Sequence, residues 1–448
     1  MKVDLTQVLI DFALVSLLLV AGAMLRKKIR FFQVNYIPVA LIGGVLGILV
    51  GPHVLGKFSP IYLNFSDSIK QWAGILSAIV FSCSFLGLRL EKVSKSARQT
   101  YFLAGTIHQM QVIVGLGATF LLGLFIKNLK FGFGILPVLG FYGGHSMAIA
   151  GGTIFDEAGY MDVGAQVGAT FATVGMLFGV IFGMYLINRA ARKGETKIKM
   201  DIESMPESLL TGYYDVDERP VMSREVTSSS SLDPLGSQLM IVGALVFCGY
   251  MMRNLLIKIN PFFKNLPLFA CCLIFSAIFC IVTQNMDSVN NKIDRSTVVR
   301  ISGTALDYMI VSSIATTSLS VFSSFAIPLI VVNILVAATT YVAVFKVGDL
   351  ILHKDSSFET KIGLFGQCCG VLATGLLLLK VVDPDFKTNA VANITSSSTL
   401  GYTYQLQYTL VFIALLMTRP LFVFLWSVGL LILLAGAGIL FNRKDRRA

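Results

Sequence analysis

Long apolar segments alternate with short polar clusters along almost the whole chain. A helix needs about 20 apolar residues to cross a hydrocarbon core of roughly 30 Å. Two stretches, 131–156 and 360–382, are apolar but interrupted by glycine-rich turns, so each predicts a pair of half-length helices. Eleven segments are long enough for a full crossing: 7–25, 36–55, 71–90, 101–126, 163–188, 237–257, 266–285, 300–319, 320–345, 400–418 and 420–441. The pattern predicts an all-α integral membrane protein with about 10–11 transmembrane helices.

The short polar clusters between these segments predict their orientation, because Lys and Arg collect in cytoplasmic loops. One arrangement places every basic cluster in the cytoplasm. It puts the N-terminus outside and the C-terminus in the cytoplasm, and it makes both interrupted stretches re-entrant hairpins. The clusters lie at 26–30, 92–98, 189–199, 292–300 and 443–447.

The two hairpins then enter the membrane from opposite sides, which predicts two inverted-topology repeats and a secondary transporter. Their glycine-rich turns, at 143–146 and 366–370, follow similar spans rich in Val, Leu and Phe. Chance similarity of two glycine-rich loops is the alternative. We expect four parts: a first repeat at 1–189, a polar cytoplasmic linker at 190–236, a second repeat at 237–418, and an extra span with a basic tail at 419–448.

Composition agrees with a membrane protein and argues against other classes. Charged residues make up 14% of the chain and hydrophobic residues 55%, with a mean hydropathy of +0.76. The net charge of +11 comes from the short clusters that orient the helices, so it does not indicate nucleic-acid binding. The seven cysteines lie within or beside apolar segments and predict neither a disulfide framework nor a zinc site. No cofactor is expected.

The first turn, Gly143-Gly144-His145-Ser146, lies about 16 Å along its hairpin, near the middle of the bilayer. Peptide groups left unpaired there need protein or a polar cavity around them. A helix that begins at Ser146 directs its positive end toward the turn, which favours a carboxylate ligand. His145 has three possible roles: binding the substrate, carrying a coupling proton, or making a structural hydrogen bond.

The second turn offers the same backbone chemistry. It contains Gly366, Gln367 and Cys368, and the Gln367 amide can both donate and accept hydrogen bonds. Thr374 lies about one turn further along the returning arm and can add a hydroxyl group. We expect the substrate to lie between the two turns.

Asp307 is the best-placed acid within a predicted span, and ionisable groups at membrane depth are candidates for function. It is a candidate Na⁺ ligand together with backbone carbonyls at Gly144 and Gly366. The alternative is that Asp307 pairs with a helix terminus or a basic neighbour. Two sets of glycines at four-residue spacing predict flat faces for close helix packing: Gly43, Gly47 and Gly51, and Gly175, Gly179 and Gly183.

Four motifs resemble the sodium/glutamate symporter family of bacterial inner membranes. They are YIPVALIGGVLGILVG from Tyr36, GGHS from Gly143, the ATF at Ala169 with its glycine series, and GQCCGVLATG from Gly366. The resemblance implies inverted repeats of five helices, a homodimer, and elevator-like carriage of glutamate with Na⁺. Ser146-Met147 and Gln367 depart from the family pattern, and the span at 420–441 lies outside its ten-helix plan.

Together, these features predict a Na⁺-coupled symporter for glutamate or a similar acidic amino acid, not an enzyme. One alternative is a transporter of another small carboxylate, coupled to protons through His145. An alternative of a different class is an intramembrane enzyme that uses His145 with Cys368 or Cys369 as a thiol nucleophile.

Overall fold

The computed structural model describes residues 5–34, 37–52, 54–88, 94–195, 217, 225–260, 268–316, 319–352, 358–383 and 388–445. Most of the predicted linker and parts of the basic clusters at 92–98, 189–199 and 443–447 lie outside these residues. The described residues form helices and turns without strands. They divide into two compact units, and each unit combines segments from both halves of the sequence.

Eight helices among the described residues are long and apolar enough to cross a membrane, so the chain is a multi-pass membrane protein. They coincide with eight of the eleven predicted spans. The other three spans, 71–90, 266–285 and 400–418, contain helices that are shorter or more polar than predicted.

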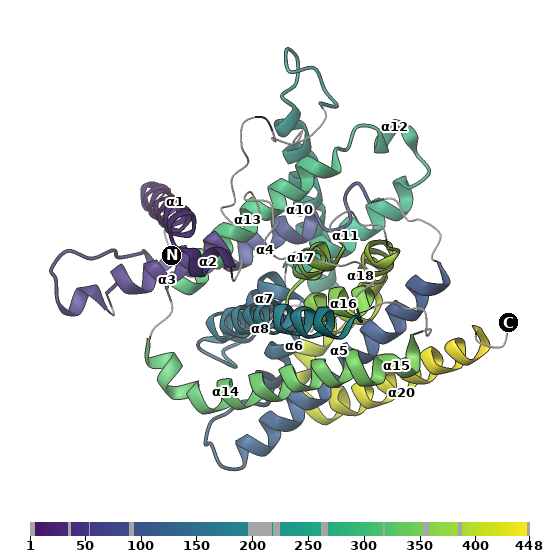
Figure 1. The fold of residues 1–448 in the computed structure, drawn as a ribbon. Coiled ribbons are helices and arrows are strands. Elements are labelled where there is room, and N and C mark those ends of the chain that lie inside the picture. Colours follow the sequence, from purple (N-terminus) through teal and green to yellow (C-terminus); the bar gives the residue numbers. More distant parts are fainter. Residues whose placement is uncertain are drawn as a thin grey trace. The chain divides into compact units, whose positions relative to one another are not determined.

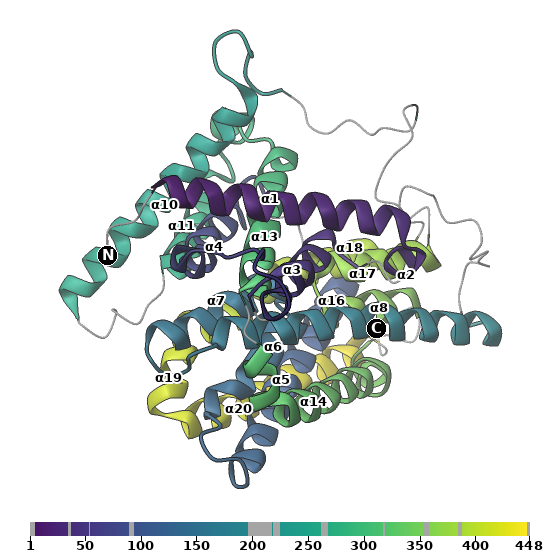
Figure 2. The same cartoon turned by 90° about the vertical axis from the view of Figure 1, so that its left-hand side faces the viewer.

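The first unit contains residues 1–33, 37–91 and 207–319. Its helices are α1 (Leu5–Lys28), α2 (Arg30–Val34), α3 (Val39–Val50), α4 (Trp72–Ser82), α10 (Pro234–Ile259), α11 (Leu268–Thr283), α12 (Asp287–Asn290) and α13 (Arg295–Ala315). Figure 2 shows α1 as one long helix that passes over α3. Glycines allow this close approach: a Cβ atom on Gly43 would lie 2.9 Å from the Leu18 carbonyl oxygen of α1, and one on Gly47 would overlap Ala315 of α13.

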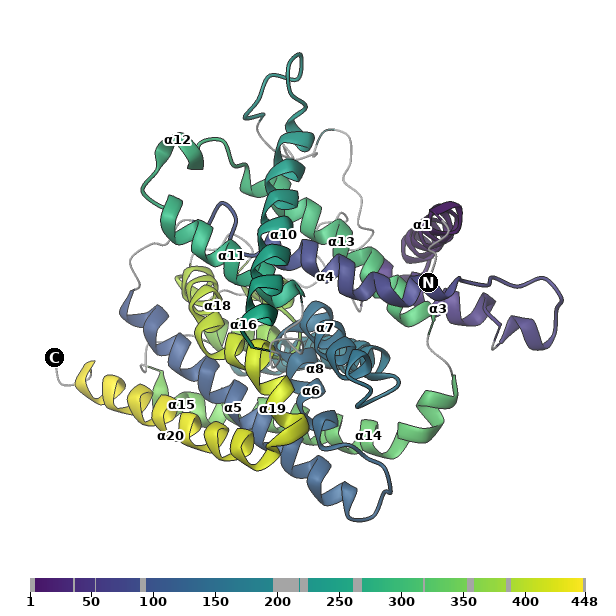
Figure 3. The same ribbon diagram turned by 180° about the vertical axis from the view of Figure 1, so that it is seen from behind.

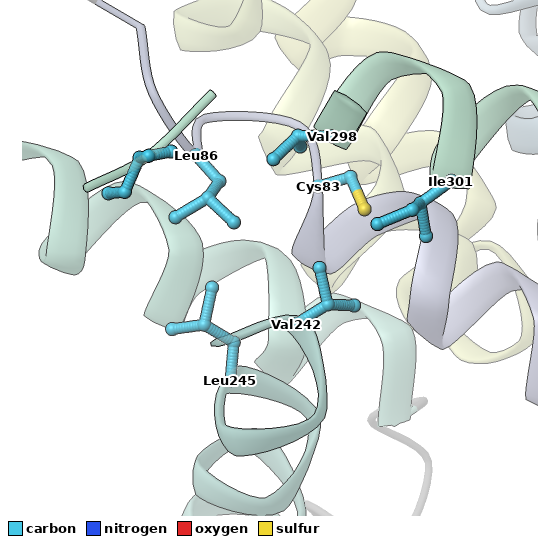
Figure 4. Close-up of a cluster of buried hydrophobic side chains, with 7 residues drawn as sticks. Cys83, Leu86, Val242, Leu245, Val298 and Ile301 are labelled. Atoms are coloured by element: carbon cyan, nitrogen blue, oxygen red, sulfur yellow. The ribbon is translucent and has the colours of Figure 1, made fainter. Parts of the chain in front are cut away.

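Helix α4 ends at Ser82 because other parts of the first unit bond the peptide groups that follow. The Arg295 guanidinium donates to the carbonyl oxygens of Cys83 (2.7 Å) and Leu86 (2.8 Å), and Ser276 accepts from the Phe85 amide (3.1 Å). A buried apolar cluster anchors the same turn (Figure 4). It contains Cys83, Leu86, Val242, Leu245, Ile293, Val298 and Ile301. Satisfied backbone groups and apolar packing together make a short helix stable there.

The second unit contains residues 34–36, 92–206 and 320–448. Its helices from the first half are α5 (Lys95–Gly123), α6 (Leu136–Phe141), α7 (Gly144–Glu157) and α8 (Gly164–Lys193). Those from the second half are α14 (Leu319–Val342), α15 (Gly348–Ile351), α16 (Phe358–Cys369), α17 (Leu372–Val382), α18 (Ala390–Gln407), α19 (Ile413–Thr418) and α20 (Pro420–Asp445). Figures 1 and 3 show α20 lying along α5.

Candidate functional site

The second unit contains two helical hairpins. The first consists of α6 and α7, and the chain turns at Tyr142 and Gly143 between them. Gly144 begins α7 with φ of +68°, a left-handed conformation that costs other L-residues energy. The second hairpin consists of α16 and α17, and it turns at Gly370 and Val371.

The turn of the second hairpin lies later than the sequence predicted. Gly366, Gln367 and Cys368 belong to the last turn of α16. Gly366 packs against the second arm, where an added Cβ atom would lie 2.9 Å from the Gly375 Cα atom and from the Thr374 carbonyl oxygen. Its lack of a side chain therefore serves the contact between α16 and α17.

The two turns touch each other. A Cβ atom on Gly144 would overlap the Val371 Cγ1 atom and lie 3.5 Å from the Gly370 carbonyl oxygen. Because Gly144 starts α7 and Val371 is the N-cap of α17, two helix N-termini meet at this point. The last residues of α6 and α16, Phe141 and Cys369, come directly before the two turns. Positive helix ends and carbonyl-rich helix ends are therefore close together.

Helix α8 supports both hairpins along its length. A Cβ atom on Gly168 would overlap the Ala148 carbonyl oxygen of α7, which shows that the two backbones are in contact. Further along α8, an added Cβ atom on Gly175 would lie 2.7 Å from the Cys369 carbonyl oxygen. One on Gly179 would lie 2.8 Å from the Cys369 Cβ atom. The glycine series at 175–183 is thus a packing face for the second hairpin, in agreement with the sequence prediction.

His145 is buried at the start of α7, where its Nε2 atom lies 3.0 Å from the Thr173 hydroxyl of α8. This contact fixes the ring beside the first turn. The neighbouring Ser146 is half-buried, and its hydroxyl donates a long hydrogen bond of 3.5 Å to the Gly143 carbonyl oxygen. Among the described residues, no hydrogen bond joins His145 to the thiols of Cys368 or Cys369, which are fully buried.

The second hairpin holds a buried amide oxygen. Gln367 is 2% exposed, and its Oε1 atom has no hydrogen-bond partner among the described residues. In the same turn, the Cys368 carbonyl accepts from the Gln111 side chain of α5 (2.9 Å), which also donates to the Thr340 hydroxyl (2.8 Å). Thr374 lies on the returning arm and is buried beside Gly370. Amide and carbonyl oxygens are ligands that suit a hard cation.

Asp307 belongs to the first unit, on α13, whereas both turns belong to the second unit. It lines an apolar cavity of about 970 Å³ together with Arg300 and Tyr308. The described residues contain no cluster of His, Cys, Asp and Glu able to hold a metal ion.

Sequence reasoning missed several buried polar contacts. Thr173, the partner of His145, is an ordinary residue of an apolar segment, and only the packing of α7 on α8 reveals its role. Asp11 of α1 is fully buried in the first unit and accepts from the Ser66 amide (3.2 Å) and the Ser68 hydroxyl (3.2 Å). An acidic residue within an apolar span indicates a buried polar contact, so the sequence could have identified Asp11.

Comparison with known proteins gives two matches. The family model for the sodium/glutamate symporter matches residues 3–355. A curated relative from Haemophilus influenzae, named sodium/glutamate symporter, is 23% identical over 281 residues. The alignment covers 61% of this chain and 64% of that relative, so the chain spans just under two thirds of the relative's length. The second hairpin and α20 lie beyond the residues that the family model matches.

Proposed function

Because the chain belongs to the sodium/glutamate symporter family, we propose that it is a secondary active transporter that carries glutamate or a similar acidic amino acid together with Na⁺. The observation that carries this proposal is the meeting of two helix N-termini and two helix C-termini at Gly144 and Val371. A co-transported anion and cation need this combination of backbone charges at one place.

The substrate carboxylate would accept hydrogen bonds from free peptide N–H groups at the first turns of α7 and α17. Gly143 and Gly144 leave the backbone accessible, and His145, Ser146 and Thr374 supply polar side chains beside it. Thr173 would keep His145 in one orientation through the 3.0 Å contact.

Na⁺ would bind to oxygen atoms at the ends of α6 and α16. The Gln367 Oε1 atom supports this assignment, because a buried amide oxygen without a partner is costly unless a ligand satisfies it. Backbone carbonyls of Gly366 in α16 and of Gly144 at the start of α7 complete this candidate set in the second unit, and Asp307 is our candidate Na⁺ ligand in the first unit. No further cofactor enters the proposed mechanism.

The transport cycle that we propose is an elevator-like movement of the second unit, which carries both hairpins. The first unit would be the scaffold of a homodimer in the bacterial inner membrane, with the N-terminus outside and the C-terminus in the cytoplasm. The division into two compact units supports this proposal, because each half of the sequence contributes to both units.

The test is uptake of labelled glutamate into proteoliposomes that contain the purified protein, with an inward Na⁺ gradient compared with an inward K⁺ gradient. We expect Na⁺-driven accumulation that excess unlabelled glutamate or aspartate blocks and that does not depend on a pH gradient. Accumulation driven by a pH gradient without Na⁺ would favour the proton-coupled alternative. No accumulation by folded protein, with any carboxylate tested, would refute the proposal.

A further inference from the structure

A line of buried hydrogen bonds begins on α20, outside the residues that the family model matches. The Ser427 hydroxyl of α20 lies 2.7 Å from the Tyr408 hydroxyl. Tyr408 donates to the Gln109 side-chain oxygen of α5, and the Gln109 Nε2 atom lies 3.2 Å from His108 Nδ1. All four side chains are at most 2% exposed, so water does not compete with these bonds.

The chemistry of these groups gives the line a direction. The Gln109 oxygen can only accept, so the Tyr408 hydroxyl donates its proton to it. The Ser427 hydroxyl lies 2.7 Å from the Tyr408 oxygen and also donates to the Val423 carbonyl oxygen (2.7 Å), so its one proton serves both neighbours. The Gln109 amide group donates to His108 Nδ1, which assigns the neutral tautomer protonated at Nε2 to His108.

His108 in turn contacts Tyr142, the residue with which the first turn begins. Its ring centroid lies 5.1 Å from that of Tyr142, at an interplanar angle of 82°. The Tyr404 and Tyr408 rings also surround His108, at 5.4 Å and 5.1 Å. The Tyr142 hydroxyl is hydrogen-bonded to the Tyr404 hydroxyl. Tyr142 is thus held at its ring and at its hydroxyl.

A π-helical segment, η8 (Tyr408–Phe412), follows α18 and begins at the tyrosine that meets α20. Such segments interrupt the regular helix ladder and are frequent at functional sites. Trp426, next to Ser427, donates to the Gln407 side-chain oxygen (3.0 Å) at an exposed position. It does not belong to the line of buried hydrogen bonds and can therefore serve as a control.

We propose that Tyr142 is a positioning residue for the first turn, and that α20 helps to set its position through Ser427, Tyr408, Gln109 and His108. Helix α20 would then contribute to the geometry of the substrate site. The expected change in KM rests on the proposed function. The expected change in hydrogen exchange does not depend on any substrate.

The test compares Ser427→Ala and Tyr404→Phe with the control Trp426→Phe. We expect each test variant to raise the KM for glutamate about fivefold with little change in maximal rate, since each loses a buried hydrogen bond to a tyrosine hydroxyl. Hydrogen exchange, measured by mass spectrometry on the peptide spanning residues 138–150, should become faster in both, while exchange elsewhere stays unchanged. The double variant Tyr142→Phe with Tyr404→Phe should be no worse than Tyr404→Phe alone, because the two share one bond.

The outcomes separate this inference from the proposed function. If the wild type transports glutamate and both test variants match Trp426→Phe in KM and in exchange, the inference is overturned. If the wild type transports nothing, the proposed function fails, and exchange in the 138–150 peptide alone decides the positioning role. A general loss of protection across the second unit would also overturn it, because that result means loosened packing.

Discussion

Replacing Gly144 with alanine tests the contact between the two turns. The structure predicts two costs. The φ of +68° disfavours any side chain by about 1 kcal/mol, and the new Cβ atom would overlap Val371, which as overpacking costs roughly 1–3 kcal/mol. Val371 is 37% exposed and can partly move away, so we expect the lower half of that range.

Gly159 provides a matched control at the other end of α7. It has φ of +64°, but an added Cβ atom there would meet nothing within 4 Å. Gly159→Ala therefore carries only the backbone cost. Adding Val371→Ala to Gly144→Ala removes the atom that clashes and leaves the backbone cost in place.

The assays are glutamate uptake and the midpoint of thermal unfolding. We expect Gly144→Ala to raise KM about tenfold, which corresponds to about 1.4 kcal/mol. Gly159→Ala should lower the unfolding midpoint without changing KM. The double variant Gly144→Ala with Val371→Ala should have a KM close to that of the wild type. If Gly144→Ala and Gly159→Ala have equal KM values, or if Val371→Ala brings no recovery, the two turns do not form the site together.

Three further results follow from the second unit. Thr173→Val removes the hydroxyl that bonds His145 and should raise KM a few-fold, roughly the worth of one hydrogen bond, with unchanged thermal stability; unchanged KM in the uptake assay would contradict the orienting role. Replacing Cys368 and Cys369 together with serine should leave Na⁺-dependent uptake in place, whereas complete loss of function in folded protein would favour the thiol enzyme. Gly179→Leu should lower the thermal midpoint through overpacking of about 1–3 kcal/mol against the second hairpin, and an unchanged midpoint would argue against that packing.

Much of the helical plan is readable from the sequence, because apolar length and glycine breaks act locally. The break before Gly144 coincides with a run of residues that favour a turn. The second turn was harder to place, since Gly366 and Gly370 both permit one and the intervening Gln-Cys-Cys can continue a helix. Only the packing of Gly366 on Gly375 decides for the later position.

Contacts between distant segments set the features that the sequence did not predict. The predicted span at 71–90 shortens because Arg295, more than 200 residues away, bonds the carbonyls of Cys83 and Leu86. Hydropathy alone contains no information about such a partner. The sequence also did not predict that Asp307, an isolated acid in a span, belongs to the first unit while both turns belong to the second.

The role of α8 in supporting both hairpins has a consequence for how the protein is made. The first hairpin precedes α8 and can dock as soon as α8 is complete. The second hairpin ends at residue 382, and at typical synthesis rates it emerges roughly 10 to 40 s after residue 194. During that interval the part of the face formed by Gly179 and Gly183 lacks the helices that later cover it. The nascent chain therefore passes through a stage at which lipid or the insertion machinery must cover this face until its partner arrives.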